Sequence, residues 1–124
     1  MDVEISARPG YLSVSVADRG DAADSRVLLQ NLLAIVRDGE HRRVLISVRR
    51  SRAIFKVEEY GLSDVLNRAA GFPGLRVAMV ADTSELFASY QYVELLAAQK
   101  GLTAKAFRSE AEALRWLFIA SASG

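Results

Sequence analysis

The feature that most constrains the fold is the stretch Arg76–Ala81, which reads RVAMVA and is followed directly by Asp82, Thr83 and Ser84. Its last five residues are all apolar, too few for an independent helix but right for a strand covered on both faces, as inner parallel strands are. Asp, Thr and Ser are good helix N-caps, so the chain is expected to leave the sheet and enter a helix here. The stretch therefore predicts half of a βαβ unit.

Similar units are predicted on either side of this stretch. Apolar and polar residues alternate over residues 3–8 and 12–16, and Pro9-Gly10 between them predicts an antiparallel hairpin. Helical spacing of apolar residues predicts four helices, around residues 28–36, 62–69, 86–97 and 114–118. Two further strands are expected at residues 44–48 and 102–107.

The resulting order, ββαβαβαβα, predicts an α/β fold with a five-stranded mixed sheet, largely parallel, and four main helices. We expect one domain over residues 1–120 and a flexible tail over residues 121–124. Since parallel crossovers are almost always right-handed, strands that neighbour one another in chain order would place every crossover helix on one face.

The predicted strands carry two unequal sets of residues. One set is strongly apolar and comprises Leu12, Val14, Val16, Val44, Ile46, Val48, Val77 and Met79. The other is smaller and more polar and comprises Ser13, Ser15, Leu45, Ser47, Arg49, Ala78 and Val80. We therefore expect helices to cover the first face well and the second face thinly.

Composition excludes several classes of function. The 124 residues are 51% hydrophobic and 25% charged, which is typical of a folded domain. With no cysteine and one histidine, disulfides and thiolate chemistry are excluded, and neither a metal site nor a cofactor is expected. The net charge of +1 gives no reason to expect a nucleic-acid partner.

The N-terminal residues give no sign of a targeting segment. Met1-Asp2-Val3-Glu4 lacks the apolar region of a signal peptide, and no apolar run approaches the ~20 residues needed to span a bilayer. Together with the absence of cysteine, this leads us to expect a cytoplasmic protein without a membrane span.

Two stretches resemble a known family. One is Arg76–Asp82, and the other is residues 106–117, in which a strand ends in Phe107-Arg108 and an acidic cap precedes Ala-Leu-Arg-Trp-Leu. With the ββαβαβαβα order, they resemble the SpoIIAA-like branch of the STAS fold, the sulfate transporter and anti-sigma factor antagonist fold. The resemblance covers nearly the whole chain in element order. It implies a βα superhelix that binds a protein or a small ligand without catalysing a reaction.

The resemblance fails at one functional motif. Anti-sigma factor antagonists of this fold carry an Asp-Ser-Ser-Gly-like phosphoacceptor at the start of the helix that follows the third strand. The matching residues 55–62 contain no serine, and Ser51 lies earlier in the chain. An antagonist-like regulator switched by phosphorylation is therefore disfavoured. The fold is also compared with lipid-binding CRAL-TRIO domains, which keeps a lipid headgroup open as a ligand.

A basic segment offers the clearest candidate site. Residues 37–56 hold seven of the 16 Lys and Arg and only two acids, a net charge of +5. Four of these cations follow the third strand: Arg49, Arg50, Arg52 and Lys56. They are expected at the carboxyl edge of a parallel strand, where open α/β sheets bind ligands, and arginines there could hold a phosphate or a carboxylate. The alternative is a solvated loop paired with Glu58 and Glu59.

The last predicted helix has more large apolar side chains than can pack against the sheet on one helix face. Trp116, Phe118 and Ile119 make it apolar on several sides, so these residues belong either to the core or to an interface between two copies. We predict a homodimer, the commonest assembly that buries such a patch, with either this helix or the thinly covered face of the sheet as the contact.

The sequence offers no catalytic residues. His41 has no serine or cysteine nucleophile in a known motif nearby, and Asp18 and Asp82 are too few for the metal site of a receiver domain. Gly-x-Gly-x-x-Gly, P-loop and Gly-x-Ser-x-Gly motifs are absent. We therefore expect a binding domain and not an enzyme.

Overall fold

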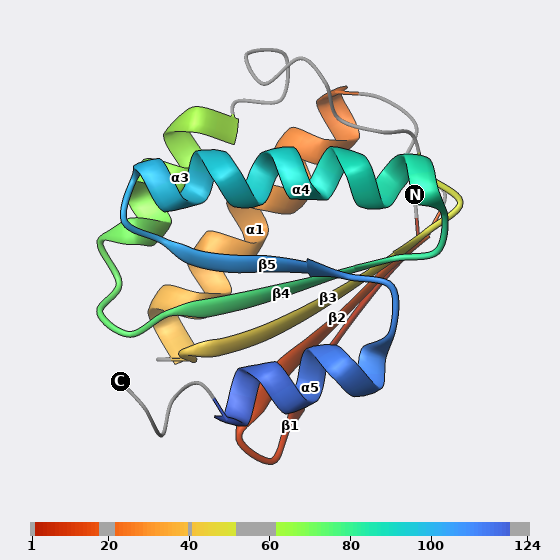
Figure 1. Ribbon diagram of the computed structural model, residues 1–124. Helices are drawn as coiled ribbons and strands as arrows, with labels where there is room; N and C mark the ends of the chain where they lie inside the picture. The colour runs from red at the N-terminus through yellow and green to blue at the C-terminus, as the bar shows by residue number, and fades with distance from the viewer. Residues whose placement is uncertain (1, 18–21, 40, 52–61, 120–124) are drawn as a thin grey trace.

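The computed structural model describes residues 2–17, 22–39, 41–51 and 62–119. In this part of the chain, one five-stranded sheet carries helices on both faces (Figure 1). The strands are β1 (Asp2–Arg8), β2 (Tyr11–Ala17), β3 (Arg43–Arg49), β4 (Arg76–Ala81) and β5 (Thr103–Phe107). The described helices are α1 (Ala22–Gly39), α3 (Leu62–Ala70), α4 (Ser84–Gln99) and α5 (Glu110–Ile119). The predicted α/β layout is confirmed at this level.

The strands neighbour one another in chain order, β1-β2-β3-β4-β5. β1 runs antiparallel to β2, as the predicted hairpin requires, and the other neighbours are parallel. β4 lies inside the sheet between β3 and β5, which confirms the prediction made from its apolar run. β1 and β5 are the two edges.

The first face of the sheet is covered by α1, α3 and α4, as right-handed crossovers require (Figure 1). The apolar set predicted from the strands lies here, and Val14 and Val16 are among the least exposed residues. The helices add residues at helical spacing, such as Leu32 and Val36 of α1 and Leu86 of α4. This face holds the main core.

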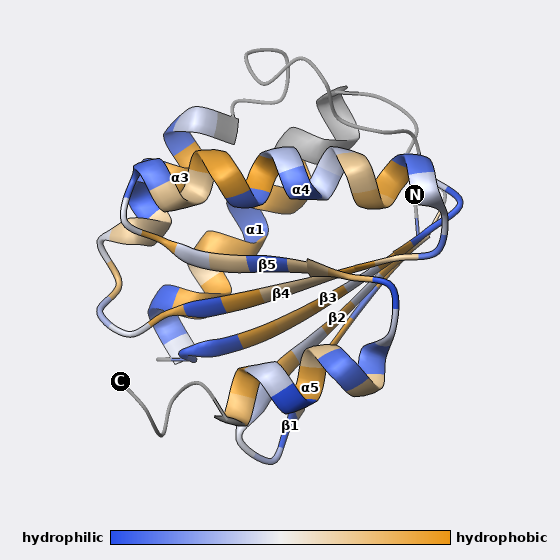
Figure 2. Ribbon diagram, in the orientation of Figure 1, coloured by the Kyte–Doolittle hydropathy of each residue, from blue (hydrophilic) through white to orange (hydrophobic). Residues whose placement is uncertain are grey.

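The second face is covered by α5, which packs on β3, β4 and β5. A separate apolar cluster forms there from Leu45, Ala78, Val80, Ala113 and Leu117. In Figure 2, apolar residues are visible along β3 and on α5. This face is thinly covered, because α5 is the one described helix on this side. The smaller and more polar side chains of the face had predicted this.

Polar caps set the start of both C-terminal helices. The N–H of Leu86 donates to Oγ1 of Thr83 at 3.1 Å, so Thr83 is the N-cap that turns the chain from β4 into α4. The N–H of Glu112 donates to Oγ of Ser109 at 3.4 Å at the start of α5. These contacts agree with the cap signals in the sequence.

The predicted tail over residues 121–124 lies outside the described residues. Within the described part, no helix is long and apolar enough to cross a membrane.

We predict that Leu117→Ala lowers the free energy of unfolding by about 3 kcal/mol, because Leu117 is 0% exposed and fills the space between α5 and the sheet. Leu95→Ala is the matched control, since Leu95 on α4 is 61% exposed and should cost well under 1 kcal/mol. Urea denaturation followed by circular dichroism measures both. Equal losses for the two variants would contradict the packing of α5.

Candidate functional site

A polar cleft of about 440 Å³ lies where β3 and β4 end, on the α5 side of the sheet. Nine residues line it: Ser15, Ser47, Val48, Arg49, Val80, Ala81, Asp82, Arg108 and Glu110. They come from β2, β3, β4, the residue after β4, the segment after β5 and the first residue of α5. This is the carboxyl edge of a parallel sheet, where open α/β folds commonly bind ligands. We call it the carboxyl-edge cleft.

The floor of the cleft is set by strand register. Ser15 of β2 lies opposite Ser47 of β3, and Ser47 lies opposite Val80 of β4. Since strand side chains alternate between faces, Arg49 lies on the same face as Ser47, two residues further along β3. Two serine hydroxyls and one guanidinium therefore line one side of the cleft.

Glu110 closes the cleft from the start of α5. The hydroxyl of Ser47 donates to Oε1 of Glu110 at 2.5 Å, which fastens the first turn of the helix to the middle strand. A carboxylate is also favoured at a helix N-terminus by the helix dipole. The contact joins residues 63 positions apart in the sequence and holds the start of α5 against β3.

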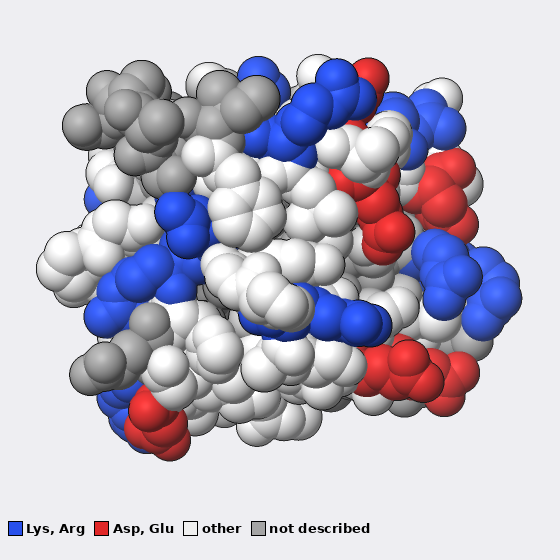
Figure 3. All heavy atoms as spheres, turned by 90° about the horizontal axis from the view of Figure 1, so that it is seen from below, with Lys and Arg blue, Asp and Glu red and all other residues white. Residues whose placement is uncertain are grey.

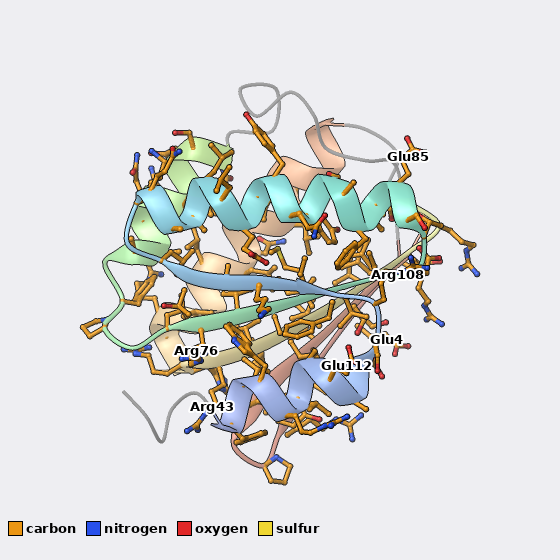
Figure 4. All side chains as sticks on the ribbon, in the orientation of Figure 1. Glu4, Arg43, Arg76, Glu85, Arg108 and Glu112 are labelled. Atoms are coloured by element: carbon orange, nitrogen blue, oxygen red, sulfur yellow. The ribbon has the colours of Figure 1, made fainter. Side chains whose placement is uncertain are left out.

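Arg108 borders the cleft on the β5 side. Its Nη1 donates to Oγ of Ser84 at 3.1 Å, and its Nη2 donates to the carbonyl oxygen of Asp82 at 3.4 Å. These bonds hold the guanidinium against the start of α4, and they leave it at the rim of the cleft (Figure 4). A second cation, held in place by these hydrogen bonds, thus lines the cleft together with Arg49.

Arg50 follows β3 in a strained conformation. Its φ of +48° lies in the left-handed region, which residues other than glycine seldom adopt. Its N–H donates to Oδ2 of Asp82 at 3.2 Å, which links the end of β3 to the end of β4. This bond offsets part of the strain and directs the chain away from the sheet immediately after Arg49.

Of the four predicted anion-site cations, the structure places Arg49 in the cleft and Arg50 beside it. Arg52 and Lys56 lie outside the described residues. Sequence reasoning missed Ser47, Arg108 and Glu110 as cleft residues. The signal for Arg108 was present, because it follows β5 just as Arg49 ends β3.

Both signs of charge meet in the cleft. Seen from the α5 side, acidic and basic atoms stand beside one another on the right, with a mostly uncharged surface in the middle (Figure 3). No group of three or more acidic or histidine residues able to hold a metal ion occurs in the described part of the chain. His41 precedes β3, at the end of the strand opposite the cleft. The cleft is therefore arranged for hydrogen bonding and charge pairing.

A second basic cluster lies at the other end of the sheet, where β3 and β4 begin. Arg43 and Arg76 are opposite one another in the register, near the C-terminal end of α5 (Figure 4). The Cζ of Arg76 lies 4.2 Å from the ring centroid of Trp116, and that of Arg43 lies 5.0 Å from the ring centroid of Phe118. Such cation–π contacts attach the end of the helix to the sheet.

Arg76 is partly buried at this end of the sheet. Burial lowers the pKa of its guanidinium, and the positive charge of Arg43 lowers this pKa further. Its Nε is buried with no hydrogen-bond acceptor among the described residues. Because arginine keeps its proton at any physiological pH, Trp116 faces a permanent cation.

The predicted interface residues have different environments. Trp116 is partly buried and packs against Phe107, with ring centroids 5.7 Å apart. Phe118 is 40% exposed, and the ring of Tyr11 contacts its ring edge-on. The ring also lies so close to Gly10 that a Cβ atom at that position would come within 3.0 Å of it. The side chain of Ile119 lies outside the described residues. Trp116 thus belongs largely to the second core, and an interface at Phe118 stays a prediction.

Comparisons of the chain with protein-family models, curated proteins and solved structures find no match. The resemblance to the SpoIIAA-like branch of the STAS fold therefore rests on the motifs and the element order of the chain itself.

We predict that Ser47→Ala lowers the free energy of unfolding by about 1 kcal/mol, because it removes the hydroxyl that donates to Glu110. Ser13→Ala is the control, since Ser13 lies on the same face one strand away and outside the cleft. Urea titrations of both variants give the comparison. A loss for Ser47→Ala no larger than that for Ser13→Ala would show that the contact does not anchor α5.

Proposed function

We propose that this chain is a non-enzymatic STAS-like domain of the SpoIIAA-like kind, and that it binds a small polar ligand with an anionic group in the carboxyl-edge cleft. The observation that carries the proposal is the position of Arg49 and Arg108. They come from the ends of different strands, and they border one cleft together with Ser15 and Ser47.

The basic groups favour a phosphate or a carboxylate. Guanidinium groups form short, charge-assisted hydrogen bonds with both anions, and serine hydroxyls can donate to the remaining oxygens. Arg108 is already held by Ser84 and by the carbonyl of Asp82, so little side-chain entropy is lost when a ligand binds. The site is thus preorganised on one side.

The acidic groups require the ligand to carry hydrogen-bond donors as well. Asp82 and Glu110 line the same cleft, and each already accepts one hydrogen bond through one carboxylate oxygen. The other oxygens would repel a ligand that is only anionic. Hydroxyl or amino groups on the ligand would satisfy them, so we propose a phosphorylated or carboxylated small molecule with donor groups.

Size supports this cleft over the apolar void in the main core. The cleft, at about 440 Å³, falls in the ~300–1,000 Å³ range of small-molecule sites. The void between the sheet and α1, α3 and α4 measures about 100 Å³ and has only apolar residues in its lining. It is too small to hold a lipid acyl chain.

The alternative function is lipid-headgroup or general anion binding by the basic loop Arg49–Lys56. It depends on Arg52 and Lys56, which lie outside the described residues. A second copy of the chain also stays a proposed partner, because Ile5, Leu95 and Phe118 leave apolar surface exposed. A cytoplasmic location stays a prediction that rests on the absence of cysteine.

The test is a titration of the ¹⁵N-labelled protein with inorganic phosphate, followed by amide chemical shifts. We predict that shifts cluster at residues 47–50, 82–84 and 108–110. Arg49→Ala and Arg108→Ala should each weaken phosphate binding about tenfold, because each removes a charge-assisted hydrogen bond.

Arg68→Ala is the matched control, since Arg68 is an exposed arginine on α3 that pairs with Asp64. Vesicles with and without anionic lipid form the second arm and address the lipid source of phosphate. Binding to anionic vesicles that needs Arg52 and Lys56 but not Arg108 would favour the alternative. Shifts spread over all cations, or unchanged by Arg108→Ala, would refute the cleft as the site.

A further inference from the structure

β1 is an edge strand, and among the described residues no strand pairs with its outer side. In the described part of the chain it ends the sheet at the side farthest from β5 (Figure 1). Its seven residues contain neither proline nor glycine, and they pair with β2 without a bulge, from Asp2 opposite Ala17 to Arg8 opposite Tyr11. An uninterrupted edge strand of this kind is a template for pairing with another chain.

The register shows which backbone groups of β1 point outward. In an antiparallel pair, residues that bond to the partner strand alternate with residues whose N–H and C=O point away from it. Arg8 and Tyr11 flank a two-residue turn, and only a hydrogen-bonded pair closes so short a turn. The even-numbered residues of β1 therefore bond to β2. The N–H and C=O groups of Val3, Ile5 and Ala7 face the open edge.

We propose that β1 pairs in antiparallel orientation with β1 of a second copy of this chain, centred on Ile5. Val3 then lies opposite the partner's Ala7, and Ile5 lies opposite the partner's Ile5. Asp2 lies opposite the partner's Arg8, which forms an ion pair at each end of the contact. The two sheets join into one continuous sheet with the main helical layers on the same side.

Charge and hydrogen bonding select this register over its neighbours. Centring on Ile5 lets every outward-facing residue exchange hydrogen bonds with another outward-facing residue. Centring on Glu4 brings two carboxylates together, which is unfavourable for directly opposed residues. Centring on Ser6 sets Glu4 opposite the partner's Arg8 but leaves Asp2 and Val3 outside the contact. If the symmetry axis falls between two residues, each odd-numbered residue lies opposite an even-numbered one. The outward-facing residues, which are odd-numbered, then cannot exchange hydrogen bonds.

The apolar side chains fit the same arrangement. Ile5 lies opposite Val14 in the hairpin, so it points to the main core side of the sheet, yet it is 38% exposed. Pairing brings the two copies of Ile5 together and covers this exposed surface. Cross-strand pairs of β-branched residues are favourable in antiparallel sheets. The contact is small and uses none of the residues that line the carboxyl-edge cleft. It should form at micromolar to millimolar concentrations.

The first measurement is amide hydrogen exchange by NMR at rising protein concentration. The amides of Val3, Ile5 and Ala7 should exchange fast in dilute solution and become protected as the concentration rises. The amides of Glu4 and Ser6 are the internal control, because they bond to β2 at every concentration. Light scattering should show the mass rising above 13.6 kDa over the same range.

Charge reversal tests the register without disturbing the hairpin. Arg8→Asp should weaken self-association roughly tenfold, because it sets like charges opposite one another at both ends, and adding Asp2→Arg should restore it. Ile5→Pro should abolish association, since it removes an outward N–H that β2 does not use. Phe118→Ser, on α5, should leave association unchanged.

Several results would overturn the proposal. A mass that stays at 13.6 kDa at millimolar concentration excludes the contact. Loss of association in Phe118→Ser would move the interface to α5, an alternative that the sequence left open. Rescue of Arg8→Asp by Glu4→Arg instead of Asp2→Arg would show that the register is wrong.

Discussion

The packing of α5 against the second face of the sheet is the contact on which the rest of the structure depends. A sheet has two faces, and crossovers place α1, α3 and α4 on only one of them. Leu117 and Ala113 of α5 are fully buried against Leu45, Ala78 and Val80, so this helix shields the middle strands from water on the other side. Without it, an inner parallel sheet would expose an apolar face, which such sheets do not tolerate.

The orientation of α5 also distributes charge along the sheet. Its N-terminal residue, Glu110, is fastened to Ser47 at the carboxyl ends of the parallel strands. Its C-terminal aromatic residues lie under Arg76 and Arg43 at the amino ends. Acids near the start of a helix and cations near its end both interact favourably with the helix dipole. The same placement that closes the second core thus forms one wall of the carboxyl-edge cleft.

Much of the fold could be predicted because local patterns carry it. The period of two in β1 and β2, the apolar run of β4 and the caps at Thr83 and Ser109 all require only neighbouring residues. The cleft could be predicted only in part. Arg49 and Asp82 follow strands that the pattern identifies, so their position at the carboxyl edge is a local inference.

The missed residues depend on long-range geometry. The sequence identified Ser47 only as a small side chain on the thinly covered face of the sheet. Its hydrogen bond to Glu110 could not be predicted, because Glu110 lies 63 residues away. Periodicity likewise could not assign Trp116 to core or interface, because a helix with apolar residues on several sides fits both. Its position became clear only from the register that brings Arg76 and Phe107 against it.

Trp116 allows the central claim, the docking of α5 on the sheet, to be tested directly, since it is the only tryptophan of the chain. The measurement is its fluorescence emission during denaturation, recorded alongside far-ultraviolet circular dichroism. The account predicts a shielded indole in the native protein and a shift to longer wavelength that coincides with the loss of secondary structure, as in a two-state transition. Native emission equal to that of the unfolded chain, or a shift that precedes the loss of secondary structure, would contradict it.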